Sequence, residues 1–402
     1  MRKLAHLSKY TTLWFLLYLC SCSEAEENTL PAPIYLIEAT PIGTFDGEAI
    51  LARYETSDSF ISLLNASTLR TVEVYEIVYN TIDTDDQPVQ ASGVFIFPND
   101  RSAYPLISYQ HGTITDPQDA PSYYQPGTEA YEAGTLLAAT GYAVAMPDYL
   151  GYGASETMLH PYEHGSSLAT ASRDMLRAVR EFCERNRVVL NDQLFLTGYS
   201  EGGYATMALH QLLETAHSDE FIVTASAPGA GAYHKTAFAE RVVNAEEELS
   251  FINTYLWVLS TYNWVYGLNR PYSDFVVEPY DAIWEQAAPV IDDDAAFPQN
   301  PQELFQPAFL AGIQEGTDTA LLNTFTDNDV HDWAPQAPIR LYHGTADDFV
   351  PYFNSQDAYE AMRANGATQV ELMPIEGGDH FTSITTFTLG VFSYFNTLKA
   401  GS

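Results

Sequence analysis

A serine in a tight turn is the clearest chemical signal in this 402-residue chain. Residues 198–203 read Gly-Tyr-Ser-Glu-Gly-Gly; they follow the apolar run 194–196 and precede the helix-forming stretch 204–209. Glycines two residues before and after Ser200 let the backbone turn sharply between a strand and a helix, which exposes the hydroxyl above the sheet. The start of the helix adds N–H groups and a positive dipole end, both suited to a developing oxyanion. The pattern predicts Ser200 as a nucleophile.

The nucleophile needs two partners further along the chain. A serine hydroxyl reacts only when a base accepts its proton, and the base is oriented by a carboxylate. After a strand–turn–helix elbow the chain order is acid, then histidine. The strand-like run 338–342 leads to two adjacent candidates for the acid, Asp347 and Asp348. The later run 370–375 leads to Gly-Gly-Asp-His, which makes His380 the candidate base.

Attack on a carbonyl group also requires N–H donors for the oxyanion that forms. The residue after the nucleophile, Glu201, supplies one of them through its backbone. The second is expected upstream, where the apolar run 104–109 ends in Gln-His-Gly-Thr, and the backbone N–H of Thr113 is the predicted donor. We expect His111 and His343, which lie at strand ends, to pack rather than to react.

These loops resemble the α/β-hydrolase superfamily. The segment 343–351 is similar to its His-Gly-x-x-Asp-x-x-Val-Pro acid loop, and this register favours Asp347 over Asp348. Four segments narrow the resemblance to the secretory lipase family of fungi and bacteria: Tyr-Gln-His-Gly-Thr at 109–113, Pro-Asp-Tyr-Leu-Gly-Tyr-Gly-Ala-Ser at 147–155, His-Pro-Tyr at 160–162, and the elbow at 198–203. The resemblance covers roughly residues 70–400. It implies a serine carboxylic-ester hydrolase with an inserted helical cap.

The order of elements agrees with an α/β-hydrolase fold. Strand-like runs at 72–79 and 89–97 read as an antiparallel pair. Strands then alternate with helical segments, a pattern typical of a mainly parallel sheet flanked by helices. The expected helices are 129–140, 167–185, 204–214, 356–365 and 382–398, and a strand is expected at 221–227.

Residues 232–333 interrupt this alternation and are rich in Tyr, Trp, Phe and Pro. A segment of this length inside a compact domain must form its own structure. We expect a cap with an amphipathic helix at 251–259, and we expect Trp257 and Trp264 to line an apolar acyl pocket. The predicted division of the chain is a lipoprotein signal peptide (1–22), a linker (23–50), the first part of the hydrolase core (51–231), the cap (232–333) and the second part of the core (334–402).

The N-terminus reads as a processing signal rather than as part of the fold. Basic residues precede the apolar run 13–19, which is too short to span a membrane as a stable helix. Leu-Cys-Ser-Cys then resembles a bacterial lipobox, in which Cys22 would be lipidated, and the acidic stretch 23–27 resembles surface-export tags of Gram-negative lipoproteins. We therefore expect an exported protein anchored in the outer membrane through Cys22. A plain secretory signal is the alternative.

Composition limits the partners. Lys and Arg total 17 against 53 Asp and Glu, a net charge of −36, which argues against binding to nucleic acid. Only Cys183 remains in the mature chain, so no disulfide is expected. The mature chain has no Cys pair, and we predict no cofactor and no metal. The acidic loops 83–86 and 291–294 leave calcium open as an alternative.

The sequence thus predicts an exported serine esterase or lipase that uses Ser200, Asp347 and His380 on apolar acyl esters, with no cofactor. Two alternatives stay open. One is a serine exopeptidase of the same fold, disfavoured because no gating domain precedes the hydrolase. The other is a non-catalytic binding lipoprotein of the cell surface. The oligomeric state and the exact ester are not predicted.

Overall fold

The computed structural model describes residues 32, 34–54, 65–287 and 297–399. The predicted signal with Cys22 and the acidic run 291–294 lie outside the described residues. The described residues from 34 onward form one compact unit. Within the described part, no helix is both long and apolar enough to cross a membrane.

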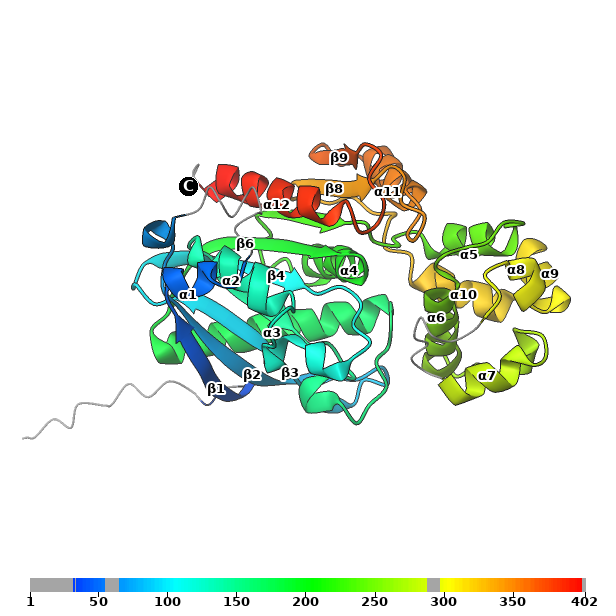
Figure 1. Cartoon of the computed structure of the whole chain (residues 1–402), viewed down its shortest axis with the longest axis horizontal. Coiled ribbons are helices and arrows are strands. Elements are labelled where there is room, and N and C mark those ends of the chain that lie inside the picture. Colours follow the sequence, from blue (N-terminus) through cyan, green and yellow to red (C-terminus); the bar gives the residue numbers. More distant parts are fainter. Residues whose placement is uncertain (1–31, 33, 55–64, 288–296, 400–402) are drawn as a thin grey trace, which may run out of the picture. The chain divides into compact units, whose positions relative to one another are not determined.

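In the described residues, the strands form one nine-stranded sheet in the order β1-β2-β3-β5-β4-β6-β7-β8-β9, seen edge-on in part in Figure 1. The first three strands and β5 pair antiparallel, and all pairs from β5 through β4 to β9 are parallel. The strands are β1 (Leu36–Phe45), β2 (Val72–Ile82), β3 (Pro88–Pro98), β4 (Ala103–Gln110), β5 (Ala143–Pro147), β6 (Val189–Tyr199), β7 (Ala225–Gly229), β8 (Ile339–Gly344) and β9 (Val370–Ile375). The predicted mainly parallel sheet with an antiparallel start is confirmed.

Helices cover both faces of this sheet because its strands are apolar on both sides. On β3, for example, Phe95 joins the core beneath α3, α4 and α11, whereas its neighbours Val94 and Ile96 join the core beneath α1, α2 and α12. The flanking helices are α1 (Gly47–Leu51), α2 (Thr135–Ala139), α3 (Gly165–Asn186), α4 (Glu201–Ala216), α11 (Phe353–Ala364) and α12 (Ile384–Lys399). Short helical turns are η2 (Ala66–Thr68), η3 (Pro117–Asp119), η4 (Pro121–Tyr123), the π-helical η5 (Ala130–Gly134), η6 (Gly153–Ser155) and η7 (Tyr272–Asp274).

Part of the expected linker 23–50 belongs to the sheet. Residues Leu36–Phe45 form the edge strand β1, and α1 begins at Gly47. The strand has little apolar pattern because its side chains are mostly exposed, so it is held by backbone pairing to β2. The carboxylate of Glu181 on α3 accepts hydrogen bonds from the N–H groups at the start of this segment, including Leu36 N at 2.8 Å. These contacts depend on tertiary structure, which the local sequence did not reveal.

The expected cap consists of helices that lie together, apart from the layers flanking the sheet (Figure 1). They are α5 (Lys235–Val243), α6 (Ile252–Val265), α7 (Tyr280–Ala287), α8 (Pro301–Leu304), α9 (Pro307–Gln314) and α10 (Thr319–Asp327). They share an apolar core of their own. The expected amphipathic helix at 251–259 corresponds to α6, but this helix is buried on nearly every side because the other cap helices surround it.

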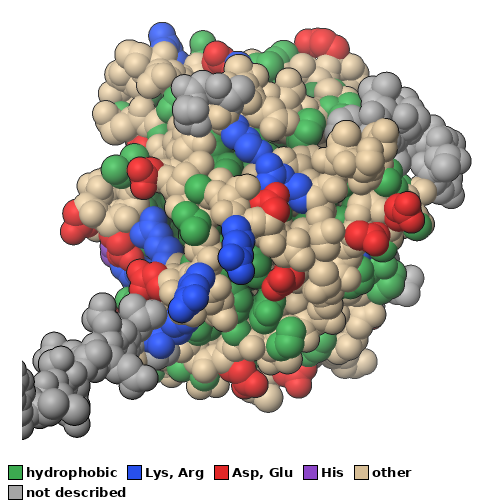
Figure 2. All heavy atoms as spheres, turned by 90° about the vertical axis from the view of Figure 1, so that its left-hand side faces the viewer, with side chains coloured by type: hydrophobic (Ala, Val, Ile, Leu, Met, Phe, Trp, Pro, Cys, Tyr) green, Lys and Arg blue, Asp and Glu red, His purple; other side chains and the backbone are tan. Residues whose placement is uncertain are grey.

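Acidic residues outnumber basic ones in this protein, but on the face turned away from the cap the two kinds are mixed. Figure 2 shows Lys and Arg side chains on that face, interspersed with Asp and Glu. With 17 basic against 53 acidic residues in the whole chain, this mixture offers no continuous basic track on the face shown.

Candidate active site

The predicted elbow is present, with Ser200 between the end of β6 and the first residue of α4. Its backbone has φ 59° and ψ −122°, a conformation that is strained for a residue with a side chain. The glycines around it permit the close approach of β4: a Cβ on Gly198 or on Gly202 would collide with the carbonyl oxygen of Gln110. The turn therefore holds the Ser200 side chain at the carboxyl end of the sheet, where open α/β sheets build their sites.

The structure brings three of the predicted residues into one hydrogen-bonded chain. His380 Nε2 lies 2.9 Å from Ser200 Oγ, and His380 Nδ1 lies 2.7 Å from Asp347 Oδ2. Because an ionised carboxylate only accepts, Nδ1 carries the proton and Nε2 presents a lone pair to the serine hydroxyl. Asp348 is exposed and makes no such contact, so the register that favoured Asp347 agrees with the geometry.

Asp347 is held in place from both sides. Its Oδ1 accepts hydrogen bonds from the backbone N–H groups of Phe349 at 3.0 Å and Val350 at 2.8 Å. Burial by itself would raise the pKa of Asp347, but hydrogen bonds from His343 and His380 outweigh it and lower the pKa to about 2. The carboxylate is therefore ionised at neutral pH and can stabilise positive charge on His380.

His343 packs at the end of β8, as expected. It is fully buried, its Nε2 donates to the carbonyl of Val350 at 2.7 Å, and Nδ1 accepts from Ser355 Oγ at 2.7 Å. His111 is also buried, with its ring 4.2 Å from that of Tyr149 and both nitrogens near backbone carbonyls. Neither imidazole contacts Ser200. His343 holds the loop that carries Asp347, and His111 holds the turn that carries Thr113.

The two predicted oxyanion donors lie at the same end of the sheet as Ser200. Glu201 is the first residue of α4, so its N–H has no acceptor within the helix. Gln110 pairs with Gly198 in the sheet, which brings the turn after β4, including Thr113, alongside the elbow. Glu129 shapes this turn by accepting a hydrogen bond from Gly112 N at 2.9 Å, and Thr113 Oγ1 bonds the Tyr162 hydroxyl at 3.0 Å.

A buried pair beneath the elbow was missed by the sequence interpretation. The side chain of Glu201 points inward, and its Oε1 lies 2.8 Å from His160 Nε2; the other nitrogen of His160 lies 2.8 Å from the carbonyl of Leu150. Both ring nitrogens thus face oxygen acceptors, so each of these two contacts must contain a proton. The pair ties the His-Pro-Tyr segment to the first residue of α4. In the sequence, only the position of the Glu201 carboxylate next to the nucleophile pointed to this pair.

A narrow pocket opens beside Ser200 beneath the cap. Its free volume is about 20 Å³, little more than one water molecule needs. Its walls are mostly apolar and come from the acid loop and from three cap helices; the main members are Phe238, Thr254, Tyr255, Val258, Phe325 and Phe349. Trp257 and Trp264, expected to line an acyl pocket, are absent from this wall. Trp257 instead stacks on Tyr162 with ring centroids 4.2 Å apart, because that side of α6 faces the core loop.

The pocket also contains a buried ion pair. Glu163 and Lys235 are both buried, both line the pocket, and the Lys235 ammonium bonds the Glu163 carboxylate. The ammonium also lies 4.3 Å from the ring centroid of Tyr204. Burial raises the pKa of Glu163 and lowers that of Lys235, although each partner favours the charged form of the other. No sequence pattern joined these residues, which lie 72 positions apart.

Asp148 and the acidic loop 83–86 both have structural roles. Asp148 is fully buried and accepts hydrogen bonds from Ser122 N at 2.8 Å and Ser92 Oγ at 2.5 Å. In the loop 83–86, Asp83 Oδ1 accepts from the backbone N–H groups of Asp85 and Gln87 at 2.9 and 2.8 Å. Asp83 therefore closes the β2–β3 hairpin.

Cys183 is buried on α3 and unpaired. Burial raises the pKa of its thiol to about 12, so it packs as a small apolar group.

The chain belongs to the alpha/beta hydrolase family, whose sequence profile matches residues 111–385. Solved structures extend the likeness over most of the chain. A candidate hydrolase of Legionella pneumophila superposes with a TM-score of 0.80 at 26% identity, covering 91% of this chain and 98% of that one. The rice cell wall degrading esterase LipA of Xanthomonas oryzae gives 0.74 at 27% identity, covering 89% and 95%.

Candida antarctica lipase A in its closed state has a TM-score of 0.62 at 16% identity, covering 89% of this chain and 83% of that one. At this identity it supports the fold alone. No curated protein matches the chain at a significant level. The expected membership of the α/β-hydrolase superfamily and the likeness to esterases and lipases are confirmed.

Proposed function

We propose that this protein hydrolyses carboxylic esters through an acyl-enzyme on Ser200. The observation that carries the proposal is the hydrogen-bonded chain from Asp347 through His380 to Ser200, on a nucleophile whose backbone is strained. A serine with such a base and orienting acid is the arrangement that acyl transfer requires. The family and its esterase and lipase neighbours support the same class.

In the proposed reaction, Ser200 Oγ attacks the ester carbonyl while His380 Nε2 accepts its proton. Asp347 keeps the imidazole in the required tautomer and stabilises the imidazolium. The N–H groups of Thr113 and Glu201 bind the oxyanion, and one such donor contributes about 3 kcal/mol to the stabilisation of the transition state. His380 then delivers the proton to the leaving alcohol. Water, activated by the same base, releases the acid and restores Ser200.

The pocket favours short acyl groups. Its walls are apolar, which suits an alkyl chain, but its free volume of about 20 Å³ does not admit a long one unless the cap side chains move. LipA of Xanthomonas oryzae is a cell wall degrading esterase, and we include acetylated cell-wall polysaccharide among the candidate substrates. We further propose export and lipid anchoring at Cys22, supported by the lipobox-like sequence.

The test compares wild type with Ser200→Ala on p-nitrophenyl esters from acetate to decanoate and on aminoacyl nitroanilides. We expect hydrolysis of short esters by wild type, a loss of ~10⁴-fold or more in Ser200→Ala, and labelling of Ser200 by a fluorophosphonate. Cleavage of the nitroanilides with little ester hydrolysis would favour the exopeptidase alternative. A stable protein with neither activity nor labelling would favour the binding protein.

A further inference from the structure

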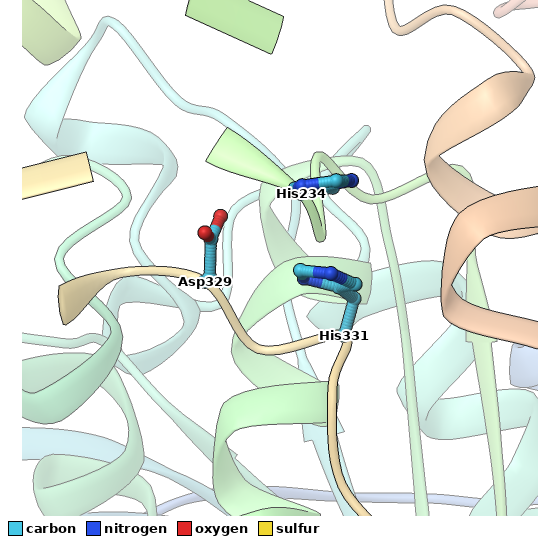
Figure 3. Close-up of side chains that lie close together, drawn as sticks. All are labelled: His234, Asp329 and His331. Carbon is cyan, nitrogen blue, oxygen red and sulfur yellow. The ribbon is translucent and has the colours of Figure 1, made fainter. Parts of the chain in front are cut away.

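Three side chains with metal-binding atoms meet at the base of the cap, outside the proposed triad. His234 is the residue before α5, and Asp329 and His331 follow α10. Figure 3 shows the two imidazole rings face to face with the Asp329 carboxylate beside them. The ring centroids are 3.7 Å apart, and one ligand atom from each residue lies within 4.8 Å of the others.

The hydrogen bonds leave ligand atoms available. His234 Nδ1 bonds Asp357 Oδ2 at 2.7 Å, so its proton is on Nδ1 and the lone pair is on Nε2. Metal-bound histidines commonly have such a carboxylate partner on the second nitrogen. His331 Nδ1 is buried and has no hydrogen-bond partner among the described residues, which is costly unless something else satisfies it.

The carboxylate is fixed as well. Asp329 accepts hydrogen bonds from Thr236 N at 3.1 Å and from Thr236 Oγ1 at 2.7 Å. These bonds use one lone pair on each oxygen, and each carboxylate oxygen has a second. Thr236 thus holds Asp329 beside the imidazoles without consuming its capacity to bind a cation.

The charges around the rings favour a divalent cation. The carboxylates of Asp329, Asp332 and Asp357 all lie near His331. Three carboxylates around two imidazoles give the cluster an excess of negative charge, which a divalent cation would balance. Two imidazole nitrogens and a carboxylate oxygen suit zinc, whereas calcium prefers oxygen ligands alone.

We infer that His234, Asp329 and His331 bind one zinc ion, with Asp357 as the positioning residue for His234. Zinc–ligand distances of about 2.0–2.2 Å place ligand atoms of a tetrahedral site about 3.4 Å apart. Binding would therefore draw the cluster together by roughly 1 Å and tilt the stacked rings toward the ion. The fourth position remains for solvent, since the site is partly exposed.

The site would fasten the cap at its base. The chain enters the cap beside Tyr233 and leaves it beside Val330, and these residues already share a backbone hydrogen bond of 3.0 Å. His234 N also donates to Asn354 Oδ1 of α11 at 3.2 Å. Zinc would add a link between the entering and leaving segments, and Asp357 would connect it to α11. This role is structural and does not depend on the proposed ester hydrolysis.

The experiment titrates zinc into chelator-treated full-length protein, with a competing colorimetric chelator to measure affinity. We expect one ion per chain, a higher melting temperature with zinc, and, with cobalt, visible ligand-field bands without a thiolate charge-transfer band. His331→Gln and Asp329→Asn should each weaken binding at least ~100-fold, and Asp357→Asn should weaken it ~10–100-fold. His217→Gln, a histidine at the end of α4 outside the cluster, should bind like wild type.

Circular dichroism without metal checks that each variant is folded. Equal zinc affinity in wild type and in folded His331→Gln would overturn the inference, as would a wild type that binds no zinc. If His331→Gln does not fold, the comparison between Asp357→Asn and His217→Gln decides, and equal affinities in those two variants would also overturn it.

Discussion

Asp347→Asn tests the proposed triad most sharply, because the surroundings of this side chain dictate how an amide must lie. Oδ1 accepts two backbone N–H bonds, from Phe349 and Val350. The amide oxygen would take this place and turn the NH₂ group toward His380 Nδ1. His380 would then have to accept at Nδ1 and carry its proton on Nε2, where it faces Ser200 and cannot act as a base.

The opposite orientation of the amide is costly. It would leave two backbone N–H groups facing an NH₂ donor, at about 1–3 kcal/mol for each unsatisfied group, or about 2–6 kcal/mol together. That range corresponds to a loss of roughly 30-fold to 10⁴-fold in the fraction with the active tautomer. Loss of the orienting acid in other serine hydrolases costs up to ~10⁴-fold, so we expect a decrease in kcat within these limits.

The assay is kcat/KM for p-nitrophenyl acetate, together with the rate of fluorophosphonate labelling. Asp348→Asn is the matched control, because it makes the same chemical change on the adjacent, exposed residue. It should stay within about twofold of wild type, as expected for a surface substitution. The reasoning is refuted if folded Asp347→Asn keeps more than a third of wild-type activity, or if Asp348→Asn is equally impaired.

Three further predictions follow from the site, the cap and the N-terminus. Val258→Ala should enlarge the pocket and raise the ratio of kcat/KM for butyrate to kcat/KM for acetate esters by about fourfold per accommodated methylene. Val265→Ala on the same helix should leave this ratio unchanged, and equal effects of the two substitutions would contradict the assignment of the pocket wall. The lowered pKa of Asp347, about 2 against 3.8, means that the ionised side chain stabilises the fold by about 2 kcal/mol above pH 4 and loses this as pH falls toward 2. Urea unfolding at pH 6 and pH 3 should therefore show a smaller pH effect in Asp347→Asn than in wild type, and identical pH effects would be inconsistent with that pKa. Cys22→Ala should move the protein out of the membrane fraction while Cys20→Ala should not, and an unmodified mature N-terminus by mass spectrometry would contradict lipid anchoring.

The sequence was most informative where function depends on local backbone geometry. Gly198 and Gly202 are required by the close approach of Gln110, and that requirement is visible as a motif. The acid and base follow strands, so Asp347 and His380 could be located from apolar runs ending in short polar loops. The alternation of runs also predicted the parallel sheet, because buried strands and flanking helices have different apolar periods.

The sequence was least informative where residues distant in the chain meet. The edge strand β1 has few buried side chains and depends on pairing with β2, so it read as linker. The aromatic cap segment gave no indication of which side of α6 faces the nucleophile. As a result Trp257 was assigned to the pocket, although Tyr255 and Val258 line it. His331 had no motif around it, because its partner His234 is separated from it by most of the cap.

The first turn of α5 shows why these distant contacts matter together. His234, the residue before this helix, belongs to the proposed zinc cluster; Lys235 forms the buried ion pair beside Ser200; and Thr236 supports Asp329. Removing one partner of a buried ion pair typically costs about 3–5 kcal/mol, so the contact between Lys235 and Glu163 strongly constrains where α5 begins. The apolar core of the cap, by contrast, draws mostly on cap residues. Polar contacts at the start of α5 therefore help to hold the cap over the nucleophile, together with contacts elsewhere such as the stacking of Trp257 on Tyr162.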